Sequence, residues 1–158
     1  MSVDIKGVQE LIDYFDKIGN KSVPKKALKK AGEHVRKVEV EVAKSRHREY
    51  SRNNAESGVN HLKSFPPRIR KGKGYIDIGL KDKGKKSNWD SIRGLYFNHY
   101  GFYHNGWHKE GTAENRIKKG KKKGKYIAGS RWMDTAYEKS SERAYELLEE
   151  GLLEGLDL

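Results

Sequence analysis

The chain of 158 residues contains no cysteine. This absence excludes disulfides, thiolate metal sites and cysteine nucleophiles. Apolar residues are also scarce: 34% of the chain is hydrophobic and 35% is charged. We therefore expect one domain, 1–158, with a small core and with long exposed loops or surfaces that neighbouring subunits complete. No apolar run is long enough to span a membrane and the N-terminus lacks the apolar centre of a signal peptide, so we expect a cytoplasmic product without a membrane partner.

Positive charge is abundant. The formal net charge is +12 and the isoelectric point is near 9.7, which favours a polyanion as partner, nucleic acid first. Lysine and glycine dominate three segments, 69–74, 81–86 and 118–125. Their lysine side chains could neutralise phosphate groups of a nucleic acid, and such contacts do not depend on the base sequence. The alternative is a set of solubilising loops. The candidate DNA-facing residues are Lys83, Lys85, Lys86, Lys118, Lys119, Lys121, Lys122, Lys123 and Lys125.

Three segments show the apolar spacing of amphipathic helices. They are a short helix at 1–20, a long helix at 21–50 and a C-terminal helix at 130–153. Ser22 and Ser130 stand where each could cap the helix that follows.

Between the helices the pattern changes to that of strands and loops. We expect a loop at 51–64, a basic connector at 68–73, and a sheet region at 74–103 whose strands, 74–80 and 92–100, pair antiparallel. A basic flexible loop is expected at 112–128. The expected class is thus α+β, with a small antiparallel β-sheet packed against the long N-terminal-half helix and the C-terminal helix. Trp132, in the first turn of the last helix, is expected to anchor that helix to the sheet.

Aromatic residues are concentrated between 89 and 107, and one strand face cannot bury them all. We interpret the excess as a possible subunit interface. The alternative is an aromatic core strand with a few exposed tyrosines. The candidate interface residues are Tyr96, Tyr100, Phe102, Tyr103 and Trp107.

Histidines gather in the same region, at His99, His104 and His108, with Glu110 nearby. A small metal-dependent nuclease with His99 or His104 as general base is one hypothesis. However, Asp and Glu residues that would hold the metal are not clustered there, and no HExxH or P-loop motif occurs. We therefore expect no catalytic residue, no metal site and no cofactor.

The order of parts resembles the gene-product-ten-like family of tailed-phage neck and tail-completion proteins. The resemblance rests on paired N-terminal helices, on the Gly, Leu and Ser of 57–64, on the aromatic segment 95–101 that ends in glycine, and on the anchor 131–133 followed by Ala136. His99 stands where the family has an acidic residue, and Arg131-Trp132 stands where it has Pro-Phe.

The resemblance implies a structural virion protein at the head–tail junction without enzymatic activity. It implies a homo-oligomeric ring, on the order of six or twelve copies, around the passage of the genomic DNA. Its neighbours would be tail-terminator, tail-tube or head-connector proteins, and it would be made in the host cytoplasm. A non-sequence-specific nucleic-acid-binding protein is the alternative function, and the nuclease is the third.

Overall fold

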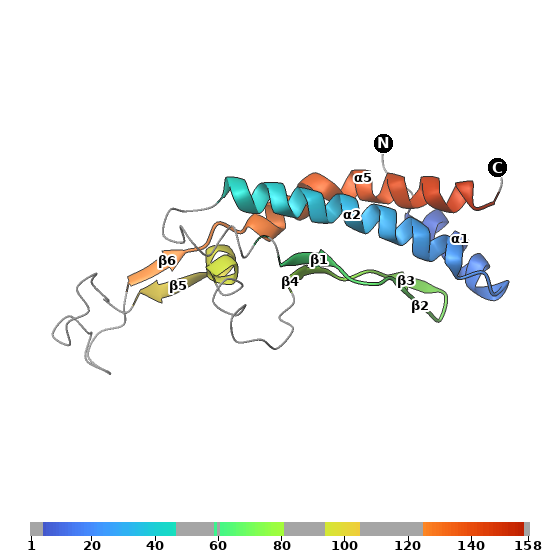
Figure 1. Ribbon diagram of the computed structural model, residues 1–158, viewed down its shortest axis with the longest axis horizontal. Coiled ribbons are helices and arrows are strands. Elements are labelled where there is room, and N and C mark those ends of the chain that lie inside the picture. Colours follow the sequence, from blue (N-terminus) through green and yellow to red (C-terminus); the bar gives the residue numbers. More distant parts are fainter. Residues whose placement is uncertain (1–4, 47–58, 60, 81–93, 105–124, 157–158) are drawn as a thin grey trace.

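The structure, a computed structural model, describes residues 5–46, 59, 61–80, 94–104 and 125–156. It is an α+β fold in which small antiparallel two-stranded sheets accompany long helices (Figure 1), which confirms the expected class. The long helices are α1 (Ile5–Lys17), α2 (Ser22–Ser45) and α5 (Trp132–Glu154). The strands are β1 (Leu62–Ser64), β2 (Arg68–Arg70), β3 (Lys73–Tyr75), β4 (Ile78–Leu80), β5 (Gly101–His104) and β6 (Lys125–Ala128).

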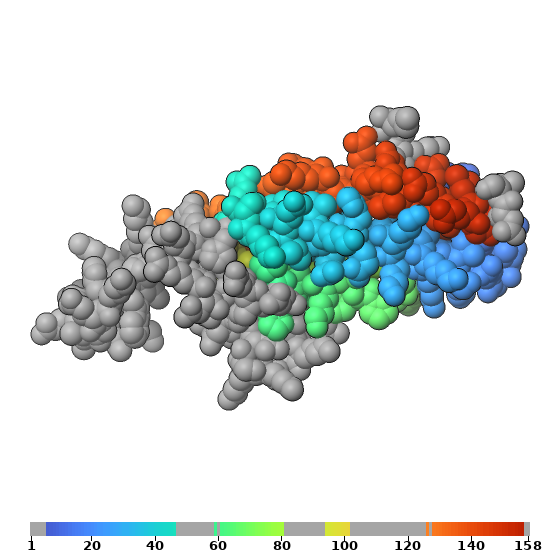
Figure 2. Space-filling view, turned by 45° about the horizontal axis from the view of Figure 1, so that its top comes forward, coloured from blue at the N-terminus to red at the C-terminus, as the bar shows by residue number. Residues whose placement is uncertain are grey.

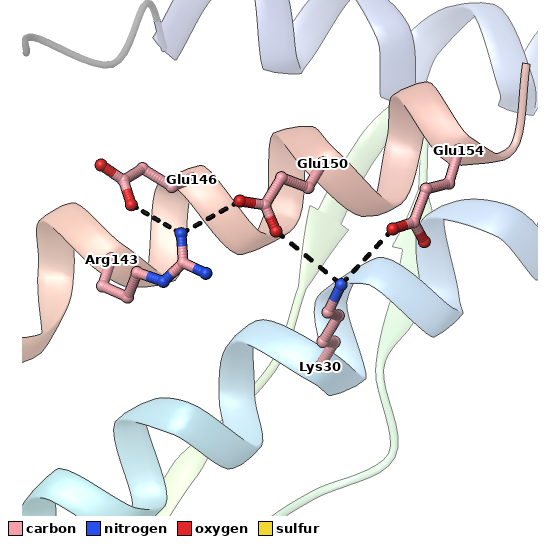
Figure 3. A network of polar contacts seen from close by, with 5 residues as sticks. All are labelled: Lys30, Arg143, Glu146, Glu150 and Glu154. Atoms are coloured by element: carbon pink, nitrogen blue, oxygen red, sulfur yellow. Dashed lines mark hydrogen bonds and ion pairs between the residues drawn. The ribbon is translucent and has the colours of Figure 1, made fainter. Parts of the chain in front are cut away.

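Helices α2 and α5 lie side by side and run in opposite directions over most of their lengths (Figure 1). Gly151 allows their close approach, because a Cβ atom there would lie 2.9 Å from the Cβ of Ala27. Ion pairs follow the same contact on its exposed side (Figure 3): Lys30 of α2 reaches Glu150 and Glu154 of α5, at 3.8 and 3.7 Å. Such exposed pairs stabilise little, about 0–1 kcal/mol each, so the apolar contact dominates.

Neither helix begins with the serine cap that we expected. The N-cap of α2 is Lys21, and the hydroxyl of Ser22 donates to the side-chain oxygen of Asn20 at 2.8 Å. The N-cap of α5 is Arg131, in the left-handed region at φ 52°, and the hydroxyl of Ser130 donates to the Asn98 carbonyl at 3.0 Å. In both cases the serine is one position away from the N-cap and its hydroxyl has another acceptor.

Residues 62–80 form a two-stranded antiparallel ribbon that lies along α2 (Figure 1). The outer pair, β1 with β4, joins Ser64 to Ile78, and the inner pair, β2 with β3, joins Arg68 to Tyr75. The register therefore shifts by one residue between the pairs, where Pro66 and Pro67 cannot donate hydrogen bonds. These strands correct three expectations: the loop at 51–64 contains β1, the connector at 68–73 is most of a hairpin, and the strand at 74–80 is interrupted.

The ribbon is attached to the helices at both ends. Its turn, Lys71-Gly72, has positive φ at both residues, as a two-residue hairpin of this type requires. The backbone N–H of Gly72 donates to Asp16 of α1 at 2.7 Å, and this bond lowers the pKa of that carboxyl. Toward the other end, the Ser64 hydroxyl donates to Glu33 of α2 and lowers the pKa of Glu33.

The expected strand at 92–100 is wrong: residues 94–100 form a short helix. Gly101, at φ 85°, ends this helix in the left-handed conformation, and β5 begins there. Strand β5 pairs antiparallel with β6, so Tyr103 lies opposite Tyr126. The last four residues of the expected loop at 112–128 are therefore a strand, and 112–124 lie outside the described residues.

The core has two parts. The first joins α1, α2 and α5 and consists of Val8, Ile12, Phe15, Ala27, Leu28, Ala31, Leu148 and Leu152. The second lies at the other end of the α2–α5 pair and consists of Val42, Ala43, Val59, Leu62, Leu95, Trp132 and Ala136. Trp132, the expected anchor, is fully buried in this second part, which joins residues of α2, the ribbon and the short helix, and it contacts the short helix directly.

Candidate interaction surfaces

Four exposed aromatic side chains gather around the short helix, and we call them the aromatic face: Tyr96, Phe97, Tyr100 and Tyr126. Each is between 39% and 51% exposed. The Tyr96 and Tyr100 ring centroids lie 4.6 Å apart, and the Tyr126 hydroxyl donates to the Tyr100 carbonyl at 2.6 Å. The helical spacing explains the grouping, since Leu95 and His99, four residues apart, take the buried side.

The start of α5 holds this helix in place. The indole N–H of Trp132 donates to the Leu95 carbonyl at 3.1 Å, and the backbone N–H of Met133 donates to Nδ1 of His99 at 3.1 Å. The backbone N–H of Ser130, two residues before Trp132, donates to the Asn98 carbonyl at 2.7 Å. An isolated helix of this length is not stable in water, so these contacts fix the aromatic face.

His99, a candidate general base in the nuclease hypothesis, has a structural role here. Its side chain is 2% exposed, and Nδ1 accepts a backbone hydrogen bond at the first turn of α5. Burial lowers the pKa of His99, so the neutral ring, with its proton on Nε2, is favoured. The nuclease hypothesis would then depend on His104, whose backbone lies in β5.

A cation lies at the edge of the aromatic face. The guanidinium carbon of Arg131 is 5.8 Å from the centre of the Tyr100 ring, a cation–π distance. Its Nε donates to Asp134 at 2.7 Å. The left-handed backbone of Arg131 places this side chain beside the short helix while α5 begins at the next residue.

The expected site residues are only partly described. Tyr96 and Tyr100 lie together on the aromatic face, and Phe102 and Tyr103 contribute backbone to β5. Trp107, His108, Glu110 and eight of the nine candidate DNA-facing lysines lie outside the described residues; the ninth, Lys125, begins β6.

Phe97 and Tyr126 are not among the residues that the sequence predicted for the interface. The spacing of four between Leu95 and His99 was the available signal, because it marks the inner side of a helix and leaves Phe97 outside. No comparable local signal placed Tyr126, which reaches the aromatic face through the pairing of β5 with β6.

An apolar groove of about 320 Å³ opens between α2, α5 and the ribbon. It lies between the two parts of the core, and its walls are contributed by residues such as Val35, Ile76 and Tyr145. At its floor Gly32 leaves space for Ile76, since a Cβ there would lie 2.4 Å from the Ile76 Cδ1 atom.

Comparison with known proteins gives no relative: no family model matches the chain, and no curated protein or solved structure matches it. Within the described ranges, no group of three His, Cys, Asp or Glu side chains has the arrangement of a metal site. No described helix combines the length and apolarity of a membrane span.

Proposed function

We propose that this chain is a structural, non-enzymatic subunit of a tailed-phage or prophage particle at the head–tail junction. It would complete the tail or join it to the head, as a homo-oligomeric ring around the DNA passage. The observation that carries the proposal is the aromatic face, which hydrogen bonds from residues 130–133 and the buried Trp132 hold at one end of the α2–α5 pair. The resemblance described above supplies the location in the particle.

An aromatic face of this kind suits contact between subunits. Tyrosine and phenylalanine lose little conformational entropy on binding and bring a large apolar area, and they are enriched in protein–protein interfaces. Here they are already ordered by the support of α5, so docking costs less than it would for a flexible segment. Arg131 at the edge adds a further residue type that is common at such interfaces.

Cryo-electron microscopy of the intact particle tests the location. The expected result is a closed ring of this chain at the neck, with the aromatic face against a neighbouring copy. Particles that are complete without the chain would refute the proposal.

A pair of matched variants tests the role of the aromatic face. Tyr96→Ser with Tyr100→Ser removes half of the face, whereas Tyr14→Ser with Tyr137→Ser removes two exposed tyrosines elsewhere. We expect the first variant to lose incorporation into particles at least about tenfold, the effect of one interface residue worth about 1.4 kcal/mol. The second should be incorporated normally. Equal incorporation of the two variants would show that the aromatic face is not the subunit contact.

A non-sequence-specific nucleic-acid-binding protein is the second candidate. The net charge of +12 favours it, as do the five Lys and Arg residues of the ribbon at 62–80. Such a protein would bind DNA as a monomer, with an affinity that falls steeply as salt rises. A ring subunit would instead need self-association for its role.

A further inference from the structure

The solvent-facing side of the ribbon carries most of the positively charged side chains found on the described strands. Exposed and less exposed residues alternate along it, so one face presents Lys63, Arg68, Arg70, Lys73 and Tyr75 to solvent. Lys71 extends this set at the turn. Among residues 62–80 five are Lys or Arg and one, Asp77, is acidic, which gives a net charge of +4. We call these five cations the basic ribbon face.

Most of these cations have no acidic partner within the described part of the chain. Arg68 pairs with Asp77 across the ribbon at 2.5 Å, and both side chains remain more than 60% exposed. No described carboxylate pairs with Lys63, Arg70 or Lys73. The charge therefore faces solvent without local neutralisation, and it attracts an anionic partner.

Half of the acidic residues in the described part of the chain lie on another element. Helix α5 carries seven Asp or Glu and two Lys or Arg, a net charge of −5. Figure 2 shows α2 between α5 and the ribbon, and Figure 1 shows the same order of layers. Helix α2 thus separates a polyanion on the ribbon side from these seven acidic residues, which are half of the fourteen within the described ranges. Asp13 and Asp16 of α1, by contrast, lie at the turn of the ribbon.

We infer that the basic ribbon face binds the phosphate backbone of duplex DNA. The opposite face of the ribbon packs on the helices through Ile69 and Ile76, so the ribbon cannot enter a groove as a free two-stranded element. Its cations instead meet phosphates from one side, and such contacts carry no base-sequence information. This inference rests on the proposed function, because the DNA bound in the particle would be the genome that passes through the neck. The basic ribbon face is the surface that would lie against that DNA.

The test compares two triple variants of the full chain with equal charge. The ribbon variant is Lys63→Gln, Arg70→Gln and Lys73→Gln; the control is Lys25→Gln, Lys26→Gln and Lys37→Gln on the exposed side of α2. Both reduce the formal net charge from +12 to +9. The measurement is fluorescence anisotropy of a labelled duplex of random sequence over a series of salt concentrations, after thermal unfolding has shown that both variants are folded.

Three lost phosphate contacts should reduce the slope of log affinity against log salt by about 2.7. At about 0.1 M salt the ribbon variant should therefore lose on the order of a hundredfold or more in affinity. The control variant should show less than a third of this reduction in slope. Equal losses in both variants would overturn the inference, because DNA would then respond to net charge alone.

A second result would also overturn it: the ribbon variant keeps its DNA affinity but loses self-association in sedimentation. The basic ribbon face would then bind an acidic protein surface, such as α5 of another copy. The anisotropy measurement needs no ring. Absence of the chain from the particle neck would therefore refute the proposed function and leave the binding result valid.

Discussion

Replacement of Trp132 by alanine should uncouple the aromatic face from the helices. The Trp132 ring is fully buried in the second part of the core, and its N–H bond to the Leu95 carbonyl is the buried link between α5 and the short helix. Removal of the ring leaves a cavity in this part of the core, to which Val42, Leu62 and Leu95 also belong, and it removes the hydrogen-bond donor. Both losses act at the place where the short helix is attached.

The size of the effect follows from these two losses. A buried aromatic side chain replaced by alanine costs about 3–5 kcal/mol in free energy of unfolding. Trp132→Phe, which keeps most of the apolar contact and loses the hydrogen bond, should cost about 1–3 kcal/mol. Urea unfolding followed by far-ultraviolet circular dichroism measures both values without the tryptophan fluorescence that the substitutions change.

Phe15→Ala provides the matched control, since Phe15 is an equally buried aromatic in the first part of the core. It should destabilise the protein by a similar amount. Hydrogen exchange of peptides from 94–100 should separate the two, because local opening of the short helix depends on its contacts with α5. A cost of less than about 1 kcal/mol for Trp132→Ala, or an equal increase of exchange at 94–100 in both variants, would refute this role of Trp132.

Two further substitutions test the packing of α2 and the ribbon. Burial raises the pKa of Glu39 to about 7, so the unfolded state ionises before the native state and Glu39 makes stability fall as pH rises from about 4.5 through 7. Glu39→Gln should therefore stabilise the folded protein by on the order of 1–3 kcal/mol at pH 8 and have little effect at pH 5. Urea unfolding at the two pH values measures this difference. An equal effect at both pH values, or the same gain from Glu41→Gln at an exposed position of α2, would contradict the prediction. Gly72→Ala should cost about 1–2 kcal/mol, because φ is +70° and the new Cβ would lie 2.3 Å from Oδ1 of Asp13. Gly94→Ala, where the Cβ meets nothing within 4 Å, should be neutral by comparison, and equal losses at the two glycines would contradict the contact.

The long helices could be predicted from the sequence because each one buries its own apolar stripe. Residues such as Ala27, Leu28 and Ala31 repeat at helical spacing and are buried as that spacing requires. The fold class follows from such helices combined with strand-like segments. The start of the second helix near Ser22 could also be predicted. The capping role of Ser22 could not, because its hydroxyl donates to Asn20, which lies outside the helix.

The short helix could not be predicted from composition alone. Its aromatic residues favour strands, and its contacts with residues 130–133 stabilise the helix. The ribbon was difficult for a related reason. Strand β2 contains one apolar residue, Ile69, and becomes a strand because that residue packs on the first part of the core while Gly72 is held by α1.

The two candidate surfaces are held in place by different contacts within the same chain. The aromatic face depends on the start of α5, whereas the basic ribbon face depends on contacts of the ribbon with α1 and α2. Figure 1 places the short helix and the β5–β6 pair at one end, while the ribbon extends along α2 toward α1. Subunits that meet through the aromatic face therefore leave most of the ribbon exposed. Assembly and DNA contact should then be separable by substitution, because a chain with a neutral ribbon keeps the residues needed to meet its neighbour.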